Sequence, residues 1–149
     1  MHPFDIKAAL LAKHAQHVVL IHFPIALFIA GVAFDFLAQW TKQRILAAAA
    51  YCNLLAAAVV TVPVLITGIL AWQWQLEGQR LKGVLLMHLV LGWASSLLIC
   101  VVCIVHVRAQ RRDGGVLPSY RLPIEALGVA LVTLTGHLGG FLSGVNIPS

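Results

Sequence analysis

Histidines are the side chains of this sequence most suited to chemistry, and three of them lie within long apolar runs. The chain has 149 residues and seven histidines, of which His22, His88 and His137 have mainly apolar neighbours. An ionisable side chain is costly to keep inside a lipid bilayer, so a histidine found there marks a candidate functional site. Neutral imidazoles are ligands of haem iron and of copper or zinc. These three residues are therefore candidate ligands of a metal or a metal-containing cofactor.

Four apolar segments supply the elements that must position these histidines. A helix needs about 20 residues to cross a hydrocarbon core of about 30 Å, and each segment reaches that length. The predicted membrane-spanning helices cover Val18 to Trp40, Ile45 to Trp72, Val84 to Val107 and Ile124 to Val145. Short connections between them predict that consecutive helices run antiparallel.

The composition is typical of an integral membrane protein. Hydrophobic residues make up 60% of the chain and charged residues 10%, and the mean hydropathy is +0.93. We expect an all-α integral membrane protein, in which residues 1–149 form a single domain, an up-down bundle of four transmembrane helices. The segment 1–16 predicts a short N-terminal helix lying at the membrane interface. The net charge of +5 comes from cations that flank the spans, which indicates contact with membrane lipid headgroups and not with nucleic acid.

Antiparallel connectivity brings the three histidines to the same end of the bundle. Counting residues places His22 roughly 7 Å, His88 roughly 9 Å and His137 roughly 12 Å from that end. His17 lies at the rim and adds a fourth imidazole to the cofactor-binding candidates. In a ring of four helices the first and third are diagonal, about 13 Å apart, which leaves room for a macrocycle and two imidazoles. We therefore predict His22 and His88 as axial ligands of a haem iron. The alternative for His137 is either an axial ligand or a hydrogen-bond donor to a haem propionate or a quinone.

Other interpretations of the polar side chains remain open. A buried histidine can simply hydrogen-bond a neighbouring helix. Cys100, Cys103 and His106 follow each other at intervals of three residues and are a weaker candidate for a soft metal near the opposite end. Asp35 lies deep in the first span, where it either relays protons to a quinone site or, as we expect, pairs with Arg44 or Arg108 at the rim of the bundle.

The distribution of cations predicts the orientation in the membrane. The end that carries the histidines also carries Lys7, Lys13, Arg80 and Lys82. The opposite end carries Lys42, Arg44, Arg108, Arg111, Arg112 and Arg121. The end richer in cations faces the cytoplasm under the positive-inside rule, which places both termini and the histidines on the outer side.

Two motifs resemble those of a known bacterial family. Residues 17–27 read HVVLIHFPIAL, where the family has H-P-x-x-V-H-F-P-I-A-L, and residues 135–140 read TGHLGG, the closing motif of the family. Thr67, Gly68 and His88 stand at plausible positions between them. The chain is thus similar to the domain of unknown function 2231 family of four-helix membrane proteins. Val18 departs from the pattern, which has proline there. Relatives occur joined to or beside cytochrome c domains, so the resemblance implies a redox role. In a bacterial inner membrane, the orientation predicted from the cations makes both termini periplasmic.

These observations favour a small membrane cytochrome b. It would bind one non-covalent haem b near the outer face and transfer electrons between quinol and a periplasmic carrier, with quinone as a second candidate ligand. A quinol-linked oxidoreductase activity would follow from that role. The alternatives are a copper- or zinc-binding or transporting membrane protein, and a structural subunit of a respiratory complex. A homo-oligomer and a larger membrane complex are both compatible with the sequence.

Overall fold

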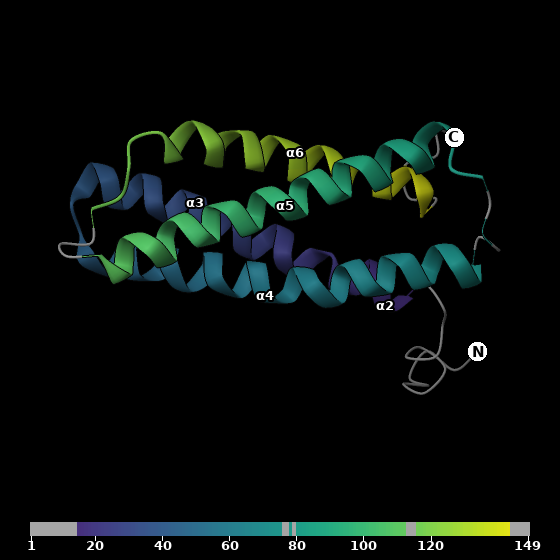
Figure 1. Ribbon diagram of the computed structural model, residues 1–149, viewed down its shortest axis with the longest axis horizontal. Helices are drawn as coiled ribbons and strands as arrows, with labels where there is room; N and C mark the ends of the chain where they lie inside the picture. The colour runs from purple at the N-terminus through teal and green to yellow at the C-terminus, as the bar shows by residue number, and fades with distance from the viewer. Residues whose placement is uncertain (1–14, 76–77, 79, 113–115, 144–149) are drawn as a thin grey trace.

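The computed structural model describes residues 15–75, 78, 80–112 and 116–143, and within them the chain is helical without a strand. The helices are α2 (Ala15–Leu20), α3 (His22–Thr41), α4 (Arg44–Gln75), α5 (Gly83–Arg111) and α6 (Arg121–Leu142). Figure 1 shows α3 to α6 running up and down side by side. Four helical segments are long and apolar enough to cross a membrane. The predicted all-α four-helix membrane fold is therefore confirmed, whereas most of the predicted interfacial helix over 1–16 lies outside the described residues.

The bundle is built from two antiparallel pairs. Helix α3 packs most closely on α4, and α5 packs most closely on α6. The first pair is closed by a tight turn in which Lys42 has a left-handed backbone (φ 59°) and donates its N–H to Ala38. The buried core lies where the two pairs meet, at Phe28, Val32, Leu54, Ala57, Ile99, Val102 and Val132. The two pairs separate from this core towards the end where α2 lies.

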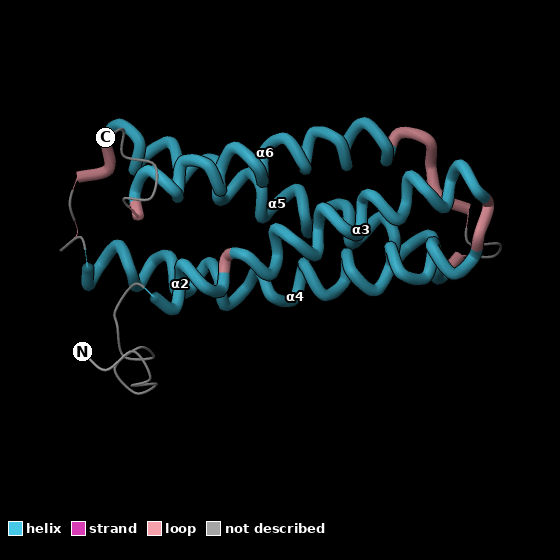
Figure 2. Tube along the Cα trace, turned by 180° about the vertical axis from the view of Figure 1, so that it is seen from behind, coloured by secondary structure: helices cyan, strands magenta, loops and turns pink. Residues whose placement is uncertain are grey.

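The first membrane span consists of two helices because Pro24 interrupts it. A proline inside a helix has no N–H to donate and its ring clashes with the carbonyl four residues earlier, which here belongs to Leu20. Helix α2 ends at Leu20 and α3 begins at His22, with Ile21 in the turn between them. Pro24 therefore breaks the span and gives α2 its own direction. In both tube and ribbon views α2 lies along the C-terminal part of α4 (Figures 1 and 2).

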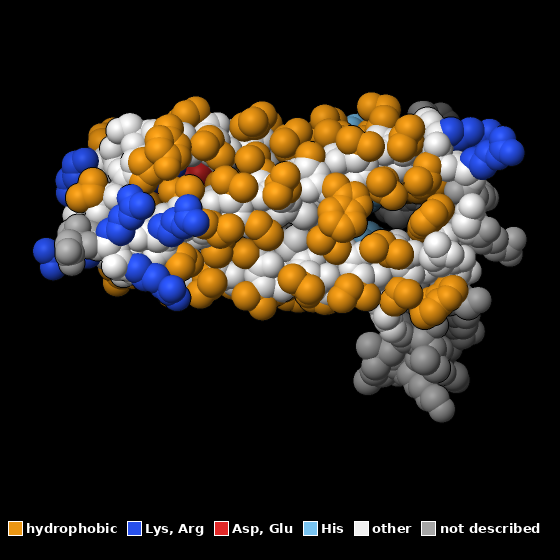
Figure 3. Space-filling view, in the orientation of Figure 1, with side chains coloured by type: hydrophobic (Ala, Val, Ile, Leu, Met, Phe, Trp, Pro, Cys, Tyr) orange, Lys and Arg blue, Asp and Glu red, His pale blue; other side chains and the backbone are white. Residues whose placement is uncertain are grey.

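The outer surface has the polarity that a membrane requires. On the face seen in Figure 3, apolar side chains cover the middle of the bundle, while lysine and arginine lie towards its two ends. Leu97 and Val59, both near the middle of their helices, have exposed fractions of 68% and 62%. Such side chains would be unfavourable in water around the whole circumference of a bundle, but lipid is their natural solvent.

Candidate functional site

A cavity of about 160 Å³ lies between α4 and α5, at the end of the bundle where α2 packs. All five helices contribute to its wall, and most of the wall is apolar. In the space-filling view this region is a hollow between α4 and α5 in which a histidine is visible (Figure 3). The cavity is therefore open towards the surface that would face lipid.

His88 is held in the wall by a bond from α5 to α6. Its Nδ1 lies 3.0 Å from the backbone carbonyl oxygen of Thr135. A carbonyl oxygen only accepts hydrogen bonds, so Nδ1 of His88 must carry the proton and donate it. In a neutral imidazole the other nitrogen then has a free lone pair. The Nε2 atom of His88 is therefore a potential ligand or acceptor.

His17 is held in the same way by a bond from α2 to α4. Its Nδ1 lies 3.2 Å from the hydroxyl oxygen of Thr67. The hydroxyl of Thr67 lies closer to two backbone carbonyls, 2.9 Å from Pro63 and 3.1 Å from Val64, and has a single proton to give them. It is thus the acceptor for His17, whose Nδ1 donates. The Nε2 of His17 also keeps its lone pair.

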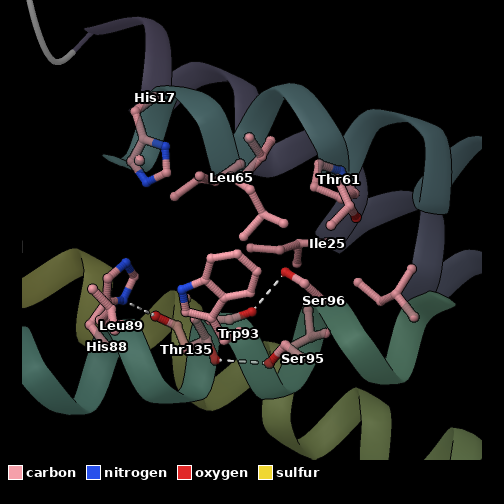
Figure 4. A pocket seen from close by; sticks show the side chains of 18 of the residues that line it. His17, Ile25, Thr61, Leu65, His88, Leu89, Trp93, Ser95, Ser96 and Thr135 are labelled. Carbon is pink, nitrogen blue, oxygen red and sulfur yellow. Dashed lines mark hydrogen bonds between the residues drawn. The ribbon is translucent and has the colours of Figure 1, made fainter. Parts of the chain in front are cut away.

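The two imidazoles face one another across one end of the cavity (Figure 4). They come from α2 and α5, that is from the first and third membrane spans, which the sequence analysis expected to be diagonal partners. Two histidines from different helices thus converge with one unprotonated nitrogen each.

The structure places the other sequence-predicted histidines differently. His22 is exposed, and its Nδ1 donates to the carbonyl of Val18 at 2.7 Å, within its own span. His137 is also exposed and packs edge-on against Phe141, with ring centroids 5.0 Å apart. Neither residue lines the cavity. The imidazole opposite His88 is therefore that of His17, the rim residue of the sequence analysis, in place of the preferred His22.

Glycines make the space that the two imidazoles occupy. A Cβ atom on Gly68 would lie 2.9 Å from Cε1 of His17, which is too close for a real contact. A Cβ on Gly139 would lie 3.2 Å from Cε1 of His88. The motif residues Thr67 and Gly68 thus position His17, and Thr135 and Gly139 position His88.

The remaining wall is apolar with a few satisfied hydroxyls. The indole of Trp93 extends across the cavity towards Leu65 and Ile25 (Figure 4). The hydroxyls of Ser95 and Thr135 lie 3.0 Å apart, and Thr135 donates to the carbonyl of Leu131, so Ser95 donates to Thr135. Because these hydroxyl protons are used within the protein, the two Nε2 atoms are the nitrogen acceptors available to a ligand.

A second polar cluster lies near the opposite end of the bundle and joins α3, α5 and α6. Asp35 accepts a hydrogen bond of 2.7 Å from Nε of Arg121, and Nε2 of His106 lies 2.8 Å from Glu125. All four side chains are buried. Asp35 therefore pairs with an arginine, but the partner is Arg121 and not Arg44 or Arg108, the two that the sequence analysis named.

Sequence reasoning missed Glu125 in this cluster. The predicted fourth span begins at Ile124, so Glu125 stands at its very start, and the sequence pattern gave it no role inside the membrane. A signal was present in the residue count. Glu125 lies four residues from Arg121, where α6 begins, and His106 lies five residues from Arg111, where α5 ends, so the two side chains stand at a similar depth from the same end of the bundle. The candidate soft-metal set is not assembled: among the described residues, the ligand atoms of Cys100, Cys103 and His106 do not come within coordination distance of one another, and His106 bonds Glu125.

The comparison with known families settles the relationship that the motifs indicated. The family described as "Predicted membrane protein (DUF2231)" matches residues 13–145. The chain belongs to the DUF2231 family. No curated protein and no solved structure matches it. In this DUF2231 chain the matched region contains the cavity with both of its histidines as well as the second polar cluster.

Proposed function

We propose that this DUF2231 protein is a small membrane cytochrome b in which His17 and His88 ligate the iron of one haem b. The observation that carries the proposal is the state of the two imidazoles. Each gives its Nδ1 proton to an acceptor on a neighbouring helix and keeps Nε2 for the cavity. A histidine that ligates a metal commonly donates its second nitrogen in this way, which fixes the ring and raises its basicity.

The two imidazole donors suit a haem, but the cavity is too small to enclose the whole macrocycle. The enclosed volume of about 160 Å³ is close to that of a cavity which admits benzene, and below the range of about 300 Å³ or more for typical ligand pockets. A macrocycle bound between His17 and His88 would therefore extend through the opening between α4 and α5. The apolar wall there, including Trp93 and Leu65, suits the edge of a porphyrin.

The residues of the chain would orient the group and control its surroundings. Thr67 and Thr135 fix the tautomer and the ring plane of the two ligands. The apolar wall would exclude water from a bound iron and, together with the basicity of the ligands, would set its reduction potential. When bound, the haem would take up and release single electrons. The opening between α4 and α5 faces lipid and gives a lipid-soluble quinol access, and a periplasmic carrier at the histidine end would be the other partner.

The direct test is the cofactor content of the purified protein. Protein expressed in haem-replete cells and purified in mild detergent should show a low-spin haem spectrum and one non-covalent haem b per chain by pyridine haemochrome assay. Metal analysis of the same sample should find iron at that ratio. Colourless protein with stoichiometric copper or zinc would contradict the haem proposal and support the metal-binding alternative.

The size of the cavity favours a second candidate, a quinol headgroup. Its single ring is the size of benzene, and its two hydroxyls could each donate to one Nε2 lone pair. The isoprenoid tail would leave between α4 and α5. Chloroform extraction of the purified protein and chromatography would reveal a retained quinone. If quinone is found without haem, His17→Ala and His88→Ala should each lower its occupancy, whereas His137→Ala should not.

A further inference from the structure

The cluster at the opposite end of the bundle from the cavity contains two halves with different charge balance. In the first half, Arg121 donates from Nε to Asp35 at 2.7 Å, from one terminal nitrogen to Gln39 at 2.9 Å, and from the other to the carbonyl of Pro118 at 3.4 Å. One positive and one negative charge are paired and hydrogen-bonded. This half is electrically neutral without help from any other group.

The second half consists of His106 and Glu125, and it contains no permanent positive charge to compensate an ionised carboxylate. His106 Nε2 lies 2.8 Å from Oε1 of Glu125, and the exposed fractions of the two side chains are 4% and 0%. Among the described residues, Oε2 of Glu125 is buried without a hydrogen-bond partner. An ionised carboxylate normally needs several donors when it is removed from water, and Glu125 has one. The charged form of this residue is therefore poorly accommodated.

Charge counting identifies what the cluster lacks. The groups that act on Glu125 are Asp35 on α3, His106 on α5 and Arg121 on its own helix. With both carboxylates ionised, Arg121 charged and His106 neutral, the cluster carries a net charge of −1. One added proton brings it to zero, which is the favourable state in a medium of low dielectric constant.

We propose that Glu125 and His106 form a reversible proton-binding site, in which Glu125 holds the proton and donates a hydrogen bond to His106. The proton comes from water at the Arg121 end, because Glu125 lies four residues into α6, roughly 6 Å along the helix. Uptake forms the O–H bond of Glu125, moves the ring proton of His106 from Nε2 to Nδ1, and changes the net charge of the cluster from −1 to zero. The ligand of this site is a proton, and the site does not depend on the occupant of the histidine cavity.

A divalent metal ion is a poorer match for the same residues. Asp35, His106 and Glu125 offer one donor atom each within 4.8 Å, which is close enough for coordination. Arg121 already occupies an oxygen of Asp35, however, and its positive charge would repel the ion. A divalent ion would also change the net charge from −1 to +1. A proton, in contrast, leaves the cluster neutral.

Infrared spectroscopy tests the site directly, because the chain has only five acidic residues and two of them, Asp35 and Glu125, lie in the membrane spans. Exposed carboxyls are ionised at neutral pH. Wild-type protein in detergent should therefore show one protonated carboxyl band, shifted in deuterated water, that disappears at alkaline pH and returns on neutralisation. Wild-type protein without this band, or with a band that never responds to pH, would overturn the proposal.

Variants of the acidic residues assign the infrared band to one carboxyl group, and zinc binding tests whether the ligand is a metal ion. Glu125→Gln should lose the band, whereas the matched control Glu77→Gln should keep it. Retention of the band in a folded Glu125→Gln variant, checked by circular dichroism, would overturn the assignment. Equilibrium dialysis against Zn²⁺ should show no stoichiometric binding that depends on Glu125. If wild-type protein binds one zinc per chain and Glu125→Gln does not, the cluster is a metal site and the proton proposal is wrong.

Discussion

The Nδ1 atom of His88 on α5 lies 3.0 Å from the carbonyl oxygen of Thr135 on α6. This bond fixes the tautomer of His88 and couples the direction of its Nε2 lone pair to the packing of two helices. The same residue, Thr135, accepts a hydrogen bond from Ser95 through its hydroxyl. Any shift of α6 against α5 should therefore change the position of the His88 imidazole in the cavity.

The bond between His17 and Thr67 provides the first prediction. Thr67→Val removes the hydroxyl that accepts from Nδ1 of His17 while keeping the shape of the side chain. If His17 is a ligand, loss of this partner should weaken cofactor binding about 10- to 100-fold, measured by haem titration of the apoprotein. Thr67→Ser keeps the hydroxyl and is the matched control. Equal affinities of both variants and wild type would show that this bond has no role in binding.

The glycines beside the imidazoles allow a steric test. Gly68→Ala would place a methyl group 2.9 Å from the ring of His17 and should displace it, with loss of the low-spin spectrum. Gly92→Ala is the control, since it also lines the cavity but its new methyl would meet Thr135 at an ordinary 3.9 Å. Visible spectra of the two purified variants decide the matter. An unchanged spectrum for Gly68→Ala would mean that His17 is not a ligand.

The ion pair of Asp35 and Arg121 should contribute to stability chiefly through the cost of separating its partners. Asp35→Asn leaves the buried guanidinium of Arg121 without its counter-charge and should lower the free energy of unfolding by about 3 to 5 kcal/mol. Replacing both residues, as Asp35→Leu with Arg121→Met, should recover most of that loss. Thermal unfolding in detergent, followed by circular dichroism, measures both. Additive losses in the double variant would contradict this account.

The distribution of lysine and arginine predicts how the protein is oriented in the membrane. Six of the ten cations lie at the end opposite the cavity, although Arg121 is held in an ion pair. A reporter fused after Ser149 should therefore be active as a periplasmic fusion, and one inserted at Gly114 as a cytoplasmic fusion. The reverse pattern would place the histidine cavity on the cytoplasmic side.

The sequence was sufficient to predict the four helices, but it did not predict which side of each helix faces the interior of the bundle. Length and hydropathy predicted four spans because a bilayer allows few alternatives, and counting along these spans placed His22, His88 and His137 at one end. The rotation of each helix about its axis is determined by packing, which counting does not address. That rotation exposes His22 and His137 and turns His88 inwards.

The break at Pro24 is the second reason why the expected pair differs from the observed one. In the predicted span, which begins at Val18, Pro24 stands near the start, where a missing N–H costs least. The span begins at Gln16, so Pro24 lies inside it and α2 separates from α3. This separation brings His17 against Thr67 on α4. The sequence shows that Pro24 cannot donate a hydrogen bond to the carbonyl of Leu20, four residues earlier. The position that this break gives to His17 depends on how α2 packs, which the sequence does not show.

The most direct test of the central claim is the reduced-minus-oxidised visible spectrum of four single variants prepared side by side. If His17 and His88 ligate a haem, His17→Ala and His88→Ala should each lose the low-spin spectrum. His22→Ala and His137→Ala, whose imidazoles lie outside the cavity, should keep the wild-type spectrum and haem content. Loss of the spectrum in His22→Ala or His137→Ala, with retention in His17→Ala, would contradict the account.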